Sequence, residues 1–474
     1  MLVDLPVLIQ KSLITDGLRI AAVVRKKIGT IFLILILGVS ACAPVISTPE
    51  TSHDSLEALL DGFSNLPPEA FINEAYQRLL LRSPETVTEV GLAEIYKTRN
   101  HRLDSYAQED FLTTQALESA LLAKALSYDR TQISEEVDFN LRLLIWLLED
   151  RAAQHPYQWF QFPLYNQQGY LTDQYLTLLL VTQPFRNRQD VEDTLSRLGA
   201  IGEQVNQIAD YLQIQHEQGI RLPYALYAAV MTEMGAHRWK VGTKTPFARV
   251  VAVRLQSLDS LSHEDRQAYY DEAGEIAEAE IIPAFERLMM VLYDLSEEAT
   301  TGIGASTQPE GSAYYQVCLN HYTSLKLSAE EIHAVGLAEV SRLQAEVWDA
   351  ASALGYADSL PIQEVFRQAT VSHNYALGLD ILVTLRTLLM EAESQVDAIV
   401  NRSFTDDLTM VPVFEGGFYE PAALDGSRRA AFYAGFTGRE AYFDMPTRVY
   451  HETYPGLHLQ FSMVQASDLT TFRK

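Results

Sequence analysis

A histidine and a glutamate stand side by side near the C-terminal end of the sequence, and a second histidine follows seven residues after the first. The segment reads DMPTRVYHETYPGLHLQ, with the pair at His451 and Glu452 and the second histidine at His458. Zinc hydrolases place two histidine ligands four residues apart on a helix, with a glutamate beside the first to activate a bound water. Here the position four residues after His451 is Pro455, so that spacing is not met.

The distance between the two histidines depends on Pro455 and Gly456, which stand between them. On a straight helix His458 would face the same way as His451 but lie roughly 10 Å further along the axis, too far for one metal with bonds of about 2 Å. Proline removes a backbone hydrogen bond and glycine permits a bulge, so the second turn could instead fold back. Spacing alone leaves both interpretations open: a folded-back metal site, or a proline-ended helix that carries two ordinary histidines.

The segment HETYPGLHLQ resembles the HExxPGHHxQ signature of the DUF885 family of bacterial proteins. Many members of this family are lipoproteins, and their helical fold is similar to that of gluzincin-type metallopeptidases. Other segments resemble the family in the same order, namely PEG followed by YY (309–315), LSAEEIHAVGLAEVSRL (327–343) and FYEPAALDGSRRAAFYA (418–434), and to a lesser degree PLYNQQG (163–169) and SRLGAIGEQVNQI (196–208). The resemblance therefore covers most of the chain.

The resemblance implies a zinc site in which His451 is a ligand and Glu452 is the general base that takes a proton from a zinc-bound water. His458 matches the second of two paired histidines in the family, whereas the first is replaced by Leu457. A downstream Phe-x-Glu-Gly-Trp-Ala segment is implied to supply the third ligand, and the sequence reaches Lys474 before such a segment. The expectation is a domain incomplete at its C-terminal end, with at most two of three zinc ligands.

A second group of candidate residues surrounds the turn signal Asp425-Gly426. Tyr419 and Arg428 flank this turn. In a peptidase, a tyrosine or an arginine at this place could stabilise an oxyanion or bind the carboxylate of a peptide substrate. The alternative is a turn that carries surface polar groups.

The N-terminal part of the sequence has the order of a secretory signal. Residues 25–42 read RKKIGTIFLILILGVSAC, with three cations, an apolar run over 31–37, and small residues before Cys42. The apolar run is shorter than the ~20 residues needed to cross a bilayer as a helix. Because Val39-Ser40-Ala41-Cys42 resembles the bacterial lipobox, we expect Cys42 to carry a lipid that anchors the protein to the membrane, outside the cytoplasm.

The segments on either side of this signal have different roles. Residues 1–24 precede the cationic region, which normally lies close to the initiator, so a translation start downstream of Met1 is the alternative to a long leader. Residues 43–55 are polar and predict a short tether. The remainder, 56–474, is expected to form the DUF885-like helical domain.

Helical periodicity dominates that domain and predicts a mainly α fold. The DUF885 resemblance implies a large multi-helix domain similar to metallopeptidases. Capped apolar stripes predict helices over 134–150, over 262–295 with a kink or division at Pro283, and over 328–354 with Ser328 and Glu331 as a capping box. The buried face of the last helix is expected to consist of Ile332, Gly336, Val340, Leu343 and Val347. Apolar and aromatic residues near 410–436 predict a small β element.

Composition restricts the possible functions. The chain has 36 Lys+Arg and 62 Asp+Glu, a net charge of −26, which argues against a nucleic-acid partner. Two hypotheses remain. The first is a membrane-anchored, zinc-dependent, peptidase-like hydrolase of the cell envelope, incomplete or inactive as written. The second is a non-catalytic envelope lipoprotein that uses its helical cleft for binding.

Overall fold

The computed structural model describes residues 55–166, 169–236, 241–302, 304–357, 360–372, 375–400, 407–414 and 416–474. Cys42, the predicted export signal and residues 43–54 of the predicted tether lie outside these residues.

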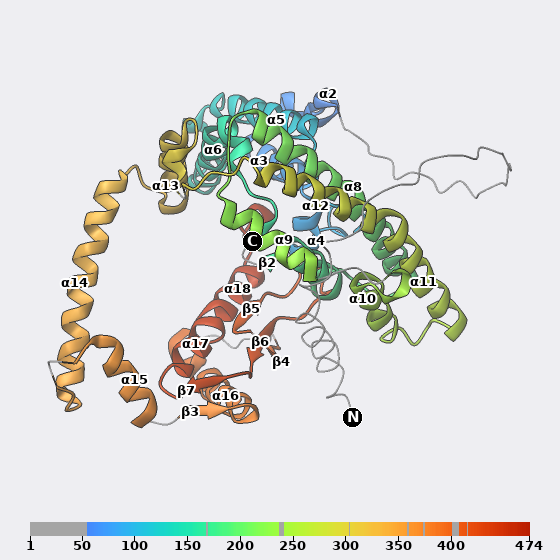
Figure 1. The fold of residues 1–474 in the computed structure, drawn as a ribbon. Helices are drawn as coiled ribbons and strands as arrows, with labels where there is room; N and C mark the ends of the chain where they lie inside the picture. The colour runs from blue at the N-terminus through green and yellow to red at the C-terminus, as the bar shows by residue number, and fades with distance from the viewer. Residues whose placement is uncertain are drawn as a thin grey trace.

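Helices and the loops between them make up most of the described chain between residues 55 and 302 (Figure 1). The α-helices of this part are α2 (Leu56–Leu60), α3 (Pro68–Leu80), α4 (Pro84–Val90), α5 (Gln108–Leu126), α6 (Glu135–Gln154), α7 (Leu171–Thr177), α8 (Arg188–Glu217), α9 (Tyr224–Ala236), α10 (Pro246–Leu255), α11 (His263–Ile276) and α12 (Ile282–Ser296). Short helical turns are η1 (Phe63–Asn65), η2 (Arg130–Gln132), η3 (His155–Phe160), η4 (Leu178–Thr182), η5 (Gly242–Lys244) and η6 (Ala277–Ile281).

The later part of the chain mixes helices with short strands. Its helices are η7 (Ala305–Thr307), α13 (Gly311–Thr323), α14 (Ala329–Ala353), α15 (Ile362–Ser372), α16 (Leu379–Val400), α17 (Met445–Glu452), α18 (Leu457–Ala466) and η8 (Thr471–Arg473). The strands of the whole chain are β1 (Tyr165–Asn166), β2 (Gly169–Tyr170), β3 (Tyr375–Leu377), β4 (Thr409–Val413), β5 (Phe418–Glu420), β6 (Ala431–Gly435) and β7 (Arg439–Ala441). The predicted mainly α, multi-helix fold is confirmed.

Helix boundaries follow the caps that the sequence predicts. The Ser262 hydroxyl accepts a hydrogen bond from the Asp265 amide at 3.0 Å, at the start of α11. Ser328 and Glu331 form the predicted capping box of α14, with bonds of 3.2 and 2.8 Å. The predicted division of 262–295 is also present, because the π turn η6 separates α11 from α12 directly before Pro283.

The largest core lies around the 30-residue helix α8, which packs along α12. Leu198, Ile201 and Val205 of α8 are fully buried, as is Leu288 of α12. A second core is formed between α3, α5 and α6, where Leu117 and Leu144 are fully buried. The first part of the molecule therefore holds most of the buried apolar surface, which is the main stabilising contribution to a fold of this size.

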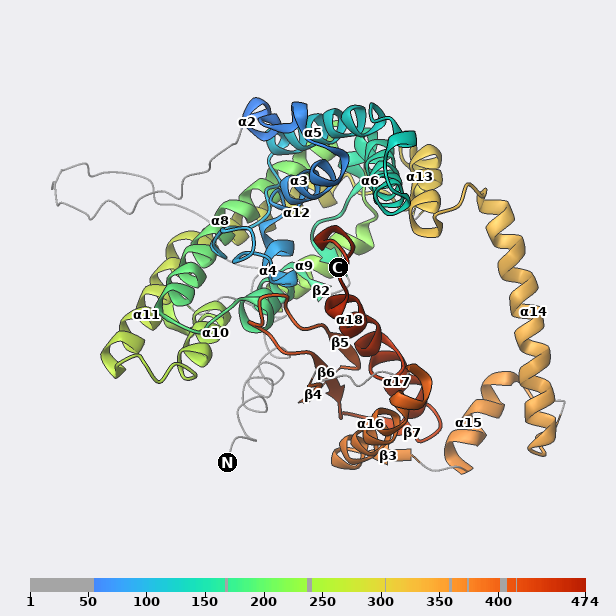
Figure 2. The same cartoon turned by 180° about the vertical axis from the view of Figure 1, so that it is seen from behind.

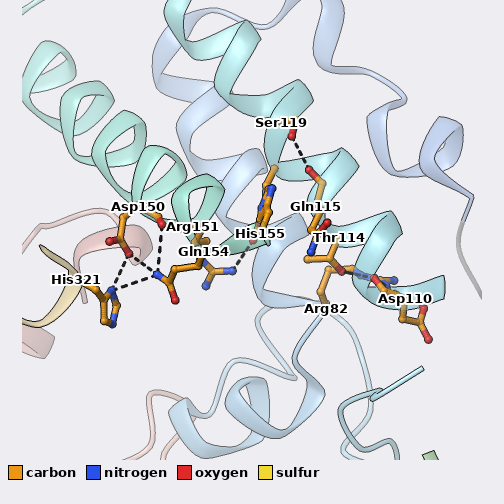
Figure 3. A network of polar contacts seen from close by, with 11 residues as sticks. Arg82, Asp110, Thr114, Gln115, Ser119, Asp150, Arg151, Gln154, His155 and His321 are labelled. Atoms are coloured by element: carbon orange, nitrogen blue, oxygen red, sulfur yellow. Dashed lines mark hydrogen bonds and ion pairs between the residues drawn. The ribbon is translucent and has the colours of Figure 1, made fainter. Parts of the chain in front are cut away.

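A polar network fastens α5, α6 and α13 to one another (Figure 3). The buried Glu118 carboxylate of α5 accepts hydrogen bonds from His155 Nε2 at 2.6 Å and from Arg151 at 2.8 Å. On the neighbouring turn, His321 Nδ1 of α13 lies 2.8 Å from the Asp150 carboxylate of α6. The entry to the later part of the chain is thus attached to the second core by a hydrogen bond between His321 and Asp150.

The strands form three small sheets. β6 lies between β4, to which it is parallel, and β5, to which it is antiparallel. This sheet agrees with the β element predicted near 410–436. Two further antiparallel pairs, β1 with β2 and β3 with β7, lie outside that range and were not predicted. A third core joins the sheet to α16, α17 and α18 through Phe432, Leu385 and Val449.

Helix α14 corrects one expectation. The predicted buried face is not covered: Val340 is 52% exposed and Leu343 is 48% exposed, and Ala351 is the one residue of α14 that is buried within the described chain. Figures 1 and 2 show why, because α14 stands apart from the other helices and links α13 to α15. An apolar stripe indicates that a helix is amphipathic, but it does not show which surface, if any, packs against the helix.

Within the described residues, no helix combines the length and the apolar character that crossing a membrane requires.

Candidate functional site

The His-Glu segment forms a corner between two short helices, α17 and α18. Helix α17 ends at Glu452, and residues 453–456 turn the chain before α18 begins at Leu457. The corner is tight: a Cβ atom on Gly456 would lie 1.9 Å from the carbonyl oxygen of His451. Only glycine fits there, so this residue allows the chain to leave the helical path, which is one of the two possibilities that the spacing left open.

His451 and Glu452 lie in the last turn of α17, and they differ in environment. His451 is exposed, whereas Glu452 is half-buried. Burial raises the pKa of the Glu452 carboxyl, opposed by the positive charge of His451, a hydrogen bond from the Tyr419 backbone amide, and the charge of Arg448. A half-buried carboxyl with a raised pKa can exchange a proton more readily near neutral pH than an ordinary glutamate can.

His458 lies in the first turn of α18 and has no exposed surface. Its Nδ1 atom is 3.1 Å from the Tyr419 hydroxyl and 3.5 Å from the Ser462 hydroxyl. The ring of Tyr454 packs edge-on against its imidazole, with 4.9 Å between centroids. These contacts are those of a histidine held within a core.

Tyr419 connects the two ends of the motif. Its backbone amide donates to the Glu452 carboxylate, and its hydroxyl contacts His458. The tyrosine is itself buried, with 9% of its surface exposed, on strand β5. The sequence placed Tyr419 near a turn as a candidate for binding substrate, and the structure places it between Glu452 and His458.

Arg428 is engaged with main-chain carbonyls. It donates to the Pro421 carbonyl at 3.2 Å and to the Glu89 carbonyl of α4 at 2.8 Å. Its guanidinium also lies 4.0 Å from the Glu420 carboxylate. Arg428 thus joins the loop that follows β5 to helix α4, and its predicted role in binding a substrate remains a prediction.

Arg448 and Glu440 are two residues of this corner that sequence reasoning missed. They form an ion pair between α17 and β7. Burial lowers the pKa of Arg448, and the Glu452 carboxylate acts in the opposite direction. The double glycine that precedes β5 is the sequence feature that could have indicated this close packing. A Cβ atom on Gly417, where φ is +127°, would lie 3.0 Å from Arg448 Cδ.

The described residues do not fit the zinc site that the family resemblance implies. Stable catalytic zinc sites use three protein ligands and leave one position for water. No group of three or more histidine, cysteine, aspartate or glutamate side chains in the described part of the chain is arranged to hold a metal ion. His458 is enclosed by Tyr419, Ser462 and Tyr454, and the residue before it is Leu457, which cannot bind a metal.

Comparison with known protein families tests the resemblance to DUF885 that the sequence motif suggests. Residues 84–474 match the model of the family described as "Bacterial protein of unknown function (DUF885)". The chain belongs to the DUF885 family. The match includes the corner between α17 and α18 and most of the helical part, so the DUF885 resemblance extends well beyond the motif.

Two solved structures share the fold of this DUF885 protein. The putative lipoprotein from Colwellia psychrerythraea is similar with a TM-score of 0.76 and 18% identity, over 83% of this chain and 72% of that one. A putative lipoprotein of unknown function from Shewanella oneidensis is similar with a TM-score of 0.58 and 14% identity, over 86% of this chain and 74% of that one. No curated protein matches this sequence significantly.

Proposed function

We propose that this DUF885 protein is a cell-envelope lipoprotein, anchored through Cys42, that binds peptide segments at the corner between α17 and α18 and does not hydrolyse them with zinc. The observation that supports this proposal is the donor set of the corner. Of its two histidines, His458 is enclosed in the core, and the described residues offer no group of three metal ligands.

Exposed aromatic side chains on the elements that form or flank the corner support peptide binding. Four aromatic side chains from β5, α17 and the segment between β7 and α17 are exposed by 39–45%: Phe418, Tyr442, Phe443 and Tyr450. Aromatic residues are enriched at the centres of protein interfaces because they offer a large apolar area at low conformational cost. The Glu452 carboxylate lies on the same elements and supplies a polar partner for a peptide amide or amine.

A zinc-dependent hydrolase of the envelope is the second candidate, and one observation favours it. Glu452 is half-buried with a raised pKa and directly follows the exposed His451. A general base beside a metal ligand has this arrangement in zinc hydrolases. If a ligand set were completed, Glu452 would be placed to take a proton from water.

One experiment separates the two candidates. The purified full chain is mixed with an unstructured peptide digest, and binding is followed by fluorescence while the peptides are analysed by mass spectrometry. Peptides should bind and stay intact, and Tyr450→Ala should weaken binding at least about threefold by removing exposed aromatic surface. Cleavage by the wild type that disappears in Glu452→Gln would show that the hydrolase candidate is correct.

The anchor has its own test. Cys42→Ser should move the protein from the membrane fraction to the soluble fraction, because the predicted acyl chains supply the attachment. A variant that stays membrane-bound after alkaline carbonate extraction would contradict anchoring through Cys42.

A further inference from the structure

A polar cavity of about 180 Å³ lies far from the α17–α18 corner in sequence, between α4, α7, α8 and the loop that precedes α5. Since one water occupies about 30 Å³ of the liquid, the cavity has room for about six waters or one small organic molecule. Its wall contains the carboxylates of Glu85 and Asp104, that of Glu89 at the exposed rim, and two tyrosines, Tyr106 and Tyr175. A pocket that combines acidic groups with aromatic walls is suited to a positively charged ligand.

The two carboxylates are held in place by reciprocal hydrogen bonds. The Glu85 amide donates to Asp104 Oδ1, and the Asp104 amide donates to Glu85 Oε1, both at 3.0 Å. Gln204 Nε2 of α8 also donates to Glu85 Oε1, at 2.7 Å, and the Ser83 hydroxyl donates to Asp104 Oδ2 at 2.7 Å. Within the described residues no hydrogen bond reaches Glu85 Oε2, so this oxygen keeps its acceptor capacity for a ligand.

The charges around the pocket leave one positive charge to be supplied. The fully buried Arg197 of α8 interacts electrostatically with both Glu85 and Asp104, and burial lowers its pKa to about 10, so it stays charged at neutral pH. With both of these carboxyls ionised, the two carboxylates and the guanidinium sum to a net charge of −1, and Glu89 at the exposed rim adds a further negative charge. Burial and the Glu85 carboxylate raise the pKa of Asp104 to about 7, so a proton balances the charge below neutral pH. A monovalent cation could replace that proton.

We propose that this cavity binds a small organic ammonium ion, whose charge is met by Glu85 and Asp104 and whose alkyl part lies against Tyr106 and Tyr175. The ammonium group would donate to Glu85 Oε2, and the aromatic faces would add a cation–π attraction. The proposal does not depend on the α17–α18 corner or on any peptide that binds there.

The titratable and charged groups that face the site come from every element around it. Helix α4 supplies Glu85 and, at the exposed rim, Glu89; the loop supplies Asp104 and Tyr106; α7 supplies Tyr175; and α8 supplies Arg197. Burial raises the pKa of Tyr106 and Tyr175 further, so neither ionises near neutral pH. The pH dependence of binding should therefore come from the Asp104 carboxyl.

The test is a calorimetric titration of the full chain with n-butylammonium, with n-butanol as the neutral ligand of the same shape. Because an alkylammonium keeps its charge up to about pH 10, it should bind about tenfold more tightly at pH 8 than at pH 6, as the carboxyl pair releases its proton. Proton release on binding, measured in two buffers of different ionisation enthalpy, should accompany it, and n-butanol should not compete.

Variants sharpen this test. Asp104→Asn and Glu85→Gln keep hydrogen-bonding groups but remove a charge, and each should weaken n-butylammonium binding at least about tenfold. The matched control Glu264→Gln, an exposed carboxylate of α11 outside the cavity wall, should change it by less than about twofold. Should either pocket variant fail to fold, the wild-type pH dependence still decides. No n-butylammonium binding at 50 mM, equal competition by n-butanol, or affinity independent of pH would overturn the proposal.

Discussion

The helices before residue 302 hold the two largest cores, whereas the region after residue 304 holds a smaller core and the uncovered helix α14. In the first region Arg197 has no exposed surface and is hydrogen bonded to Thr88 at 2.7 Å, and Leu198 beside it is fully buried. In the second region His451 is exposed and Leu343 of α14 is 48% exposed. The comparison teaches that the part of the chain that carries the family motif is not the part that supplies most of the stability.

The largest effect expected from this comparison is on the core of the first region. Leu198→Ala should lower the free energy of unfolding by about 2–5 kcal/mol, because it removes buried apolar surface and leaves a cavity. The matched change Leu343→Ala on α14 should alter it by no more than about 0.5 kcal/mol. Urea denaturation of both variants checks the difference. Equal losses would show that α14 is covered in solution.

A second pair of variants compares two glycines of the second region. Gly456→Ala places a Cβ atom 1.9 Å from the His451 carbonyl oxygen and should destabilise the corner by roughly 2 kcal/mol. Gly336→Ala in α14 meets no atom within 4 Å and should stabilise by about 0.5–1 kcal/mol, because alanine is the better helix former. Thermal unfolding of each variant tests the pair, and a harmless Gly456→Ala would contradict the tight corner.

The smallest expected effect is the pH dependence of stability that arises from Asp104 in the first region. The pKa of Asp104 is about 7 in the folded protein, against an ordinary value of 3.8. Between these values the folded protein holds a proton that the unfolded chain has released, so this carboxyl lowers stability as the pH rises. Asp104→Asn cannot titrate, so between pH 5 and pH 8 it should lose less free energy of unfolding than the wild type.

The expected difference is on the order of 1 kcal/mol, since one pKa unit corresponds to about 1.4 kcal/mol and the effect is reduced by relaxation around the carboxyl. Urea titrations at the two pH values measure it, with Glu89→Gln at the exposed rim as the control. Parallel pH profiles for Asp104→Asn and the wild type would contradict the burial of a negative charge at this site.

Sequence patterns predicted what depends on local chemistry. The capping box at Ser328 and Glu331 and the division near Pro283 are each determined by residues close together in the chain. The corner at Gly456 was one of two possibilities that the sequence left open. The exposure of α14 could not be predicted in this way, because its apolar stripe has the same appearance whether or not another element covers it.

Contacts between segments that are far apart in the chain also could not be predicted from the sequence. Nothing in the spacing of residues places the Tyr419 hydroxyl at His458, 39 residues later, or the Glu440 carboxylate at Arg448 on another element. The carboxyls Glu85 and Asp104 lie 19 residues apart, and they meet only because the loop before α5 returns to the start of α4. Such pairs arise from the tertiary path of the chain, which local periodicity does not encode.

The most direct test of the account is the number of zinc ions per chain, measured by elemental analysis of the purified full chain after incubation with zinc and removal of the excess. We predict well below one zinc per chain, with no further loss in His451→Ala or in His458→Ala, because the described residues do not assemble three ligands. One zinc per chain that is lost in both variants would contradict the account and establish the corner between α17 and α18 as a metal site.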